Sequence, residues 1–148
     1  MLIAAHSISA GVVGEVVENP ILAFLLGFIL HFILDAIPHF DSTDGGKFTK
    51  RQIALLAIDG TIGLAVLIYL FFNSSHQLSF VAGVFGGLLP DMLDNVPWWE
   101  DKFRKSKFGK VFHAFHDYIQ LIKLKPVLGL SVQCIIVFLS IYIFLTLR

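Results

Sequence analysis

Residues 21–41 read ILAFLLGFILHFILDAIPHFD and place His31 and Asp35 inside an almost continuous apolar run. Residues 80–97, FVAGVFGGLLPDMLDNVP, do the same with Asp91 and Asp94. Ionisable groups in an apolar helix are costly, so they usually face one another and mark a functional site. The two stretches therefore predict apolar helices that share one polar site.

The composition favours a membrane protein of one domain, residues 1–148. Hydrophobic residues make up 56% of the chain and charged residues only 15%, and the mean hydropathy is +0.79. These values argue against an ordinary water-soluble domain. The net charge of zero argues against a nucleic-acid partner. The single cysteine, Cys134, excludes an internal disulfide and a Cys-rich zinc site.

The hydrophobic pattern predicts an all-α fold, an integral membrane helical bundle of five to six helices. We expect helices over residues 2–17, 20–38, 51–72 and 78–93, a turn-rich loop over 41–46 and a charged connector over 100–110. Residues 108–122 are amphipathic, which predicts a helix at the membrane surface or over the site. Residues 126–147 are uniformly apolar and long enough to span a bilayer.

A weak internal repeat relates residues 2–41 to residues 52–97. An offset of 56 residues pairs Gly27 with Gly83 and Asp35 with Asp91. The repeat predicts two pseudo-repeated helical hairpins with a cavity between them, followed by the amphipathic helix and the C-terminal span.

Antiparallel alternation of these helices brings the ionisable side chains to one end of the bundle. Of the 11 Lys and Arg residues, ten fall at that same end: Lys47, Lys50, Arg51, Lys102, Arg104, Lys105, Lys107, Lys110, Lys123 and Lys125. Because Lys and Arg are enriched in cytoplasmic loops, we expect a multi-pass protein of the cell (inner or plasma) membrane whose site faces the cytoplasm.

The spacing of the ionisable side chains suits a metal. His31 and Asp35 are one helical turn apart, as are Asp91 and Asp94 and the pair His113 and His116. Nitrogen and oxygen ligands without cysteine suit zinc, with manganese or iron as alternatives. The predicted ligands of one or two ions are His6, His31, Asp35, Asp91, Asp94, His113 and His116. Two ions a few ångströms apart would clamp an in-line displacement at phosphorus and activate a water.

Four further side chains have more than one interpretation. Asp59 is the candidate general base toward the activated water, although it could also be a ligand or stabilise its helix. His39 and Asp41 fit a role beside the ligands or exposure to solvent, with metal ligation as a further alternative. Asp117 stands one turn from His113 and could be a ligand or structural.

Two motifs resemble a known family. His31-Phe-Ile-Leu-Asp35 and Gly87-Leu-Leu-Pro-Asp91 are similar to motifs of the membrane-bound, LexA-regulated metal-dependent hydrolases. Residues 30–40 also resemble the zinc-ligand segment of zinc-dependent phospholipase C. The resemblance implies a metal-dependent hydrolase of phosphoester-like bonds. Two features depart from the family pattern: here His-x3-Asp precedes Leu-Pro-Asp, and Asp94 is followed by Asn95 instead of histidine.

Together these features predict a membrane-bound hydrolase that acts on a lipid or lipid-linked phosphoester. Two alternatives stay open at this stage. Polar residues within helices also line the paths of divalent-metal transporters and channels. A non-catalytic membrane scaffold with a structural metal would hold a fully coordinated ion. Membrane lipid is the expected partner, and a homo-oligomer is possible.

Overall fold

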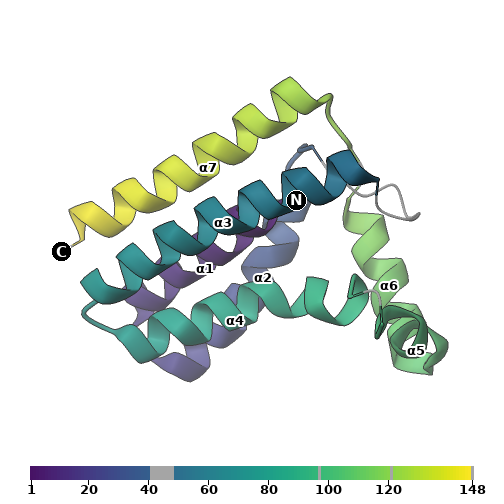
Figure 1. Cartoon of the computed structure of the whole chain (residues 1–148). Coiled ribbons are helices and arrows are strands. Elements are labelled where there is room, and N and C mark those ends of the chain that lie inside the picture. The colour runs from purple at the N-terminus through teal and green to yellow at the C-terminus, as the bar shows by residue number, and fades with distance from the viewer. Residues whose placement is uncertain (41–48, 97, 121, 148) are drawn as a thin grey trace.

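The fold is given by a computed structural model that describes residues 1–40, 49–96, 98–120 and 122–147. In these ranges the chain forms seven α-helices and no strand, which confirms the all-α class (Figure 1). The helices are α1 (Ile3–Val17), α2 (Pro20–Ala36), α3 (Lys50–Asn73), α4 (Gln77–Asp94), α5 (Glu100–Lys105), α6 (Lys107–Ile119) and α7 (Pro126–Thr146).

The expected number of five to six helices was too low, because the charged connector contains a helix of its own, α5. Glu100 and Asp101 lie in the first turn of α5, and Lys102, Arg104 and Lys105 lie toward its end. These charges complement the helix dipole at both ends. A helix of six residues without an apolar stripe has no hydrophobic periodicity, so the sequence pattern did not reveal it.

Local capping explains where several helices begin. The Asn19 side chain accepts hydrogen bonds from the amides of Ile21 and Leu22, and Pro20 occupies the first turn of α2. Thr49 and Gln52 form a capping box at the start of α3. The Ser106 side chain caps α6 by accepting a hydrogen bond from the backbone amide of Gly109. These starts agree closely with the expected ranges.

Helix α1 lies at the centre of the bundle, and hydrogen bonds to residues distant in sequence hold both of its ends. Its N-terminus has no side-chain cap of its own. Instead, Gln133 of α7 accepts from the amide of Leu2 at 2.8 Å, and Asp59 of α3 accepts from the amide of Ala4 at 3.0 Å. Near the other end, buried Glu15 accepts from the amide of Ser75, just before α4. The position of α1 is therefore set by contacts distant in sequence.

Glycines let α1, α2 and α4 approach backbone to backbone. A Cβ atom added to Gly83 of α4 would lie 2.2 Å from the carbonyl oxygen of Ala10 in α1. A Cβ atom on Gly27 of α2 would lie 2.5 Å from the carbonyl oxygen of Gly83. Gly27 and Gly83 are the pair that the 56-residue offset makes equivalent. Small residues at such crossings are typical of helices packed within membranes.

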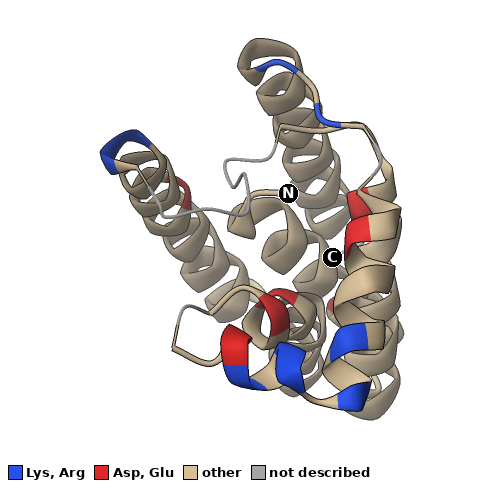
Figure 2. Ribbon diagram, turned by 90° about the vertical axis from the view of Figure 1, so that its right-hand side faces the viewer, with Lys and Arg blue, Asp and Glu red and all other residues tan. Residues whose placement is uncertain are grey.

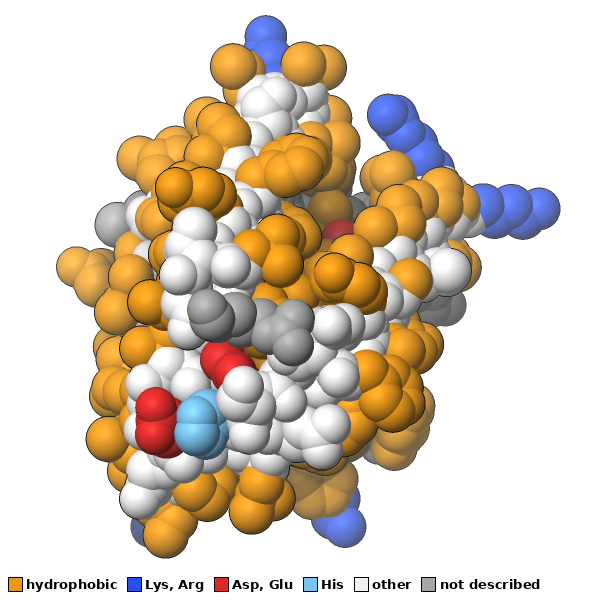
Figure 3. Space-filling view, turned by 90° about the vertical axis from the view of Figure 1, so that its left-hand side faces the viewer, with side chains coloured by type: hydrophobic (Ala, Val, Ile, Leu, Met, Phe, Trp, Pro, Cys, Tyr) orange, Lys and Arg blue, Asp and Glu red, His pale blue; other side chains and the backbone are white. Residues whose placement is uncertain are grey.

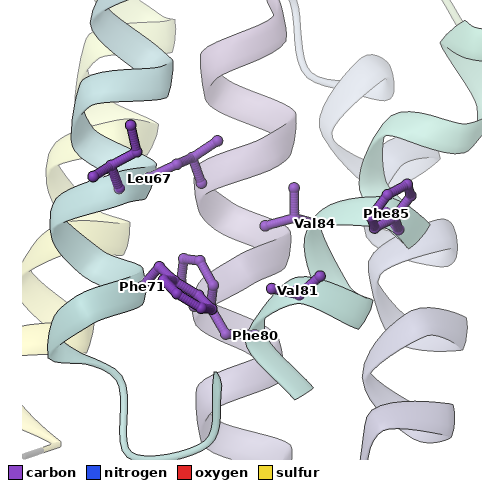
Figure 4. Close-up of a pocket in the computed structure, with 7 residues that line it drawn as sticks. Leu67, Phe71, Phe80, Val81, Val84 and Phe85 are labelled. Carbon is purple, nitrogen blue, oxygen red and sulfur yellow. The ribbon is translucent and has the colours of Figure 1, made fainter. Parts of the chain in front are cut away.

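Helix α3 packs beside α1 and leaves an apolar groove against α4 (Figure 4). The groove is lined by Leu67, Ile68, Phe71, Phe80, Val81, Val84 and Phe85. Next to it, Ala4, Ile8, Val12, Leu70, Phe80 and Phe144 form the main buried apolar cluster. By length and composition, two of the described helices, α3 and α7, are able to cross a membrane, while α1 and α2 are apolar but shorter.

The glycine contacts make a stability prediction. Gly83→Ala should destabilise the protein by about 1–3 kcal/mol, because the methyl group would meet the α1 backbone. Gly60→Ala is the matched control, since a Cβ there meets nothing within 4 Å and alanine favours a helix by up to ~1 kcal/mol. Thermal unfolding of the two variants measures both effects. Equal midpoints would contradict the close packing.

Candidate metal centre

The side chain of Asp35, near the end of α2, is the centre of a buried polar cluster. Its Oδ1 atom lies 3.1 Å from His6 Nε2 of α1. Its Oδ2 atom lies 3.2 Å from His31 Nε2 of α2 and 3.0 Å from His116 Nε2 of α6. The amino group of Met1 and the side-chain Nε2 of Gln120 also donate to this carboxylate, at 3.1 and 2.9 Å. Three helices thus converge on one carboxylate.

The orientation of His31 leaves one ring nitrogen available to a cation. Its Nδ1 atom lies 2.7 Å from the carbonyl oxygen of Gly87. Because a carbonyl oxygen only accepts, Nδ1 carries the hydrogen and Nε2 of the neutral ring has a free lone pair. Pro90 has no N–H, so it removes the α4 backbone hydrogen bond to the carbonyl oxygen of Gly86, the residue before Gly87. A backbone carbonyl holding the second nitrogen is the usual arrangement of a metal-binding histidine.

His116 has the equivalent arrangement with a carboxylate. Its Nδ1 atom donates to Asp94 Oδ2 at 3.2 Å, and its Nε2 atom lies 3.2 Å from His31 Nε2. The Nε2 atoms of His31 and His116 face each other, and both face the Asp35 carboxylate. Such an arrangement of acceptors requires a cation or a proton between them. Burial by itself would lower the pKa of His116, but its hydrogen bonds to Asp35 and Asp94 raise that pKa to about 9. Without a metal, a proton therefore takes the place that the geometry offers to a cation.

Two groups of side chains have the geometry to hold a metal ion. His31, Asp35 and His116 form the first, and His6, His31 and Asp91 form the second. In each group the candidate ligand atoms lie within 4.8 Å of one another. Among the described residues His6 Nδ1 is buried without a hydrogen-bond partner, so this nitrogen is also open to a cation. The residues present therefore fit a divalent metal with nitrogen and oxygen ligands.

Asp91 lies at the accessible side of the cluster. Its Oδ1 atom is 3.8 Å from the Nε2 atoms of both His31 and His116. The Asp91 side chain is 22% exposed, whereas those of His31 and Asp35 are fully buried. Because His31 has one free nitrogen and belongs to both groups, it can serve only one ion at a time.

Asp94 and His113 join the cluster but lie outside both ligand groups. Asp94 Oδ1 accepts from Arg104 Nε at 2.9 Å, and its Oδ2 accepts from Nδ1 of His113 at 2.8 Å as well as from His116. With both oxygens occupied, Asp94 is placed to orient His116. His113 lies at the rim with a side chain that is 32% exposed.

The remaining candidates lie in different places. Asp59 accepts from the amide of Ala4 at the start of α1 and belongs to neither ligand group. Asp117 is largely exposed, with its Oδ2 atom 3.7 Å from His113 Nε2. His39 is buried, with its Nε2 atom 3.8 Å from Asp35 Oδ1. Asp41 lies outside the residues that the structure describes.

Sequence reasoning missed three groups that contact the cluster. Gln120 follows His116 by one helical turn, so the amphipathic pattern could have included it. Arg104 binds Asp94 from α5, the helix that the pattern did not predict. The amino group of Met1 contacts Asp35 only because α1 begins beside the end of α2. The contacts of Arg104 and Met1 do not follow from spacing within one helix.

The charges are distributed unevenly between the two ends of the bundle. Every Lys and Arg in the described ranges lies on α5, α6, the segment before α7 or the start of α3, at the end that carries the cluster (Figure 2). The opposite end is mostly apolar, with a small patch of acidic and histidine side chains (Figure 3). There His76 Nε2 lies 3.5 Å from Glu18 Oε1.

Comparison of the chain with protein-family models, with curated proteins and with solved structures found no match. The resemblance to metal-dependent hydrolases therefore stays a prediction from the two motifs.

The environment of His116 predicts how the metal-free protein responds to pH. The pKa of His116 is about 9 in the folded state against a usual value of 6.5. The protonated ring therefore stabilises the fold fully below pH 6.5, by up to ~3 kcal/mol, and this stabilisation is lost as pH rises toward 9. Unfolding midpoints of the metal-free protein should fall over this range, and His116→Gln should remove the dependence. A midpoint that is flat from pH 6.5 to 9 would contradict the assignment.

The role of Asp94 is tested by its isosteric amide. Asp94→Asn should weaken zinc binding about 10- to 100-fold, because the amide cannot accept from His113, His116 and Arg104 together. Competition with a chromogenic chelator measures this affinity. Asp101→Asn, at an exposed position of α5, is the matched control and should bind zinc like the unmodified protein.

Proposed function

We propose that the protein is a membrane-embedded, metal-dependent hydrolase that acts on a phosphoester of a lipid or a lipid-linked substrate. The observation that carries the proposal is the convergence of three side chains: His31 and His116 both direct Nε2 at the Asp35 carboxylate. Each imidazole has its other nitrogen held by an acceptor, Gly87 O or Asp94. Such paired contacts are characteristic of a preorganised metal site.

Zinc is the metal that this donor set fits best, with manganese or iron as alternatives. His31, Asp35 and His116 would hold it, and His6 with Asp91 would complete the shell or hold a second ion. A bound divalent cation would polarise a phosphoryl oxygen and lower the pKa of a water molecule.

The rim of the cluster offers the protein's own proton-transfer group. His113 donates Nδ1–H to Asp94, so Nε2 of the neutral ring, 3.7 Å from Asp117 Oδ2, carries the lone pair that a general base needs. The partly exposed side chains of His113 and Asp91 are on the accessible side of the site. His113 therefore fits the role of general base better than Asp59, whose carboxylate binds the amide of Ala4.

The uncovered apolar surface supports the membrane part of the proposal. Large apolar side chains on α2, α3 and α7 are exposed along most of each helix, including Ile21, Ile29, Ile62, Phe72, Val127 and Phe138. Soluble monomers rarely expose contiguous apolar surface of this extent. The basic residues at the cluster end favour a cytoplasmic site, where a lipid phosphate would lie close to the cluster. The apolar groove between α3 and α4 suits an acyl chain.

The fold gives less support to the transporter alternative. A transport path needs polar groups through the whole depth of the membrane. Among the described residues, the bundle beyond the metal centre holds the buried apolar residues around Ile8, Phe80 and Phe144. The buried hydroxyl groups of Ser9 and Ser140 in this part bind each other, at 2.8 Å. The ionisable groups of the cluster gather instead at one end, as a hydrolytic site at the headgroup level requires.

The proposal predicts that one histidine controls both metal content and turnover. His31→Ala should remove most bound zinc and should abolish hydrolysis of a chromogenic phosphodiester or of phosphatidylglycerol in vesicles. His76→Ala is the control, because His76 lies at the opposite end of the bundle beside Glu18. Elemental analysis and product release measure the two effects.

The outcomes separate the parts of the proposal. Unchanged metal content in His31→Ala would rule out the metal centre. Zinc binding without hydrolysis of either substrate would rule out the proposed reaction with these substrates. Zinc flux into liposomes without hydrolysis would establish transport instead.

A further inference from the structure

Helix α6 has two faces with different surroundings. On one face Phe108, Val111, Phe115 and Tyr118 follow one another at helical spacing and are between 50% and 71% exposed. We call these four residues the outer stripe. On the other face Phe112 and His116 are buried. A stripe of exposed apolar side chains along an amphipathic helix is typical of helices that lie in a membrane interface.

The inner face connects α6 to the metal centre. His116 reaches Asp35 and His31 of α2 and Asp94 of α4. Beside it, the Phe32 ring of α2 packs edge-on against Phe112 and Phe115, with centroids 6.0 and 5.2 Å apart. Any force that holds α6 in this position therefore also holds a candidate metal ligand.

The charges around α6 identify the surface that the outer stripe fits. Lys107 and Lys110 lie on α6 itself, Lys102 and Lys105 on α5, and Lys123 shortly after α6. Helix α6 lies across the end of the bundle instead of along it (Figure 1). Basic residues beside an apolar helix face favour anionic lipid headgroups, at about 1 kcal/mol per residue near the surface. The exposed face of α2 continues the apolar surface through the Phe32–Phe115 contact.

We propose that α6 couples the membrane surface to the metal centre. The outer stripe binds the interface of a bilayer that contains anionic lipids, and this binding holds His116 at Asp35. Coupling between two sites is reciprocal, so a cation bound at the cluster also holds α6 on the bilayer. The inference rests on the metal centre of the proposed function but not on the hydrolytic reaction.

The test compares zinc affinity in two kinds of nanodisc. The full chain is placed in nanodiscs of phosphatidylcholine alone or of phosphatidylcholine with phosphatidylglycerol, and zinc is titrated against a chelator. We expect about 10-fold tighter binding in the anionic nanodiscs, within the usual range of coupling between sites. The double variant Phe108→Ser, Val111→Ser should lose this difference.

A matched control removes the same chemical groups from another helix. Phe138→Ser, Val127→Ser alters two exposed residues of α7, and should keep the dependence on anionic lipid. Lys107→Gln, Lys110→Gln leaves the outer stripe intact and should reduce the dependence by weakening the attraction to headgroups. Amide hydrogen exchange of residues 107–119 is a second readout, and zinc should slow it more in anionic nanodiscs.

Three results would overturn the inference. Equal zinc affinity of the unmodified chain in both nanodiscs would leave the metal centre intact but exclude the coupling. A stripe variant that changes the particle mass and keeps the lipid dependence would assign the outer stripe to contact with a second copy. Absence of zinc binding in every nanodisc would remove the metal centre itself, and with it both proposals.

Discussion

The buried carboxylate of Asp35 is the constraint on which the arrangement of the cluster depends. A carboxylate out of water is tolerated only where hydrogen bonds and opposite charge surround it. Here His6, His31, His116 and Gln120 all contact it, from α1, α2, α6 and the residue after α6. Hydrogen bonding to this one carboxylate therefore brings α1, α2 and α6 together. The same contacts gather nitrogen and oxygen atoms of the kind that bind a divalent cation.

The acceptors that bind Nδ1 of His31 and of His116 fix the orientation of both rings. Gly87 fixes the His31 ring through a backbone carbonyl, and Asp94 fixes the His116 ring through a carboxylate. Arg104 holds Asp94 in turn, so α5 contributes to the site although it supplies no ligand. These contacts direct both Nε2 atoms at one point, and the hydrogen bonds of His116 to Asp35 and Asp94 raise its pKa to about 9.

Close helix packing brings these groups within reach of one another. The glycines at the crossing of α1, α2 and α4 allow backbone contact, which brings the ends of the three helices together. The same end carries the basic residues (Figure 2), and α6 lies across it (Figure 1) with an exposed apolar face. Beyond this level, the interior of the described helices holds the buried apolar cluster around Ile8, Phe80 and Phe144.

The sequence by itself determined the all-α class, most helix boundaries and the pairing of His31 with Asp35, because hydrophobic periodicity and i, i+4 spacing are local properties. Antiparallel alternation of the predicted helices added Asp91 and His116 at the same end of the bundle. Only the tertiary structure decided which residues are candidate ligands and which support them. Asp94 and Asp59 look alike in sequence, yet one orients His116 and the other caps α1. Helix α5 and the contacts of Arg104 depend on partners distant in the chain, so no pattern within one helix could have indicated them.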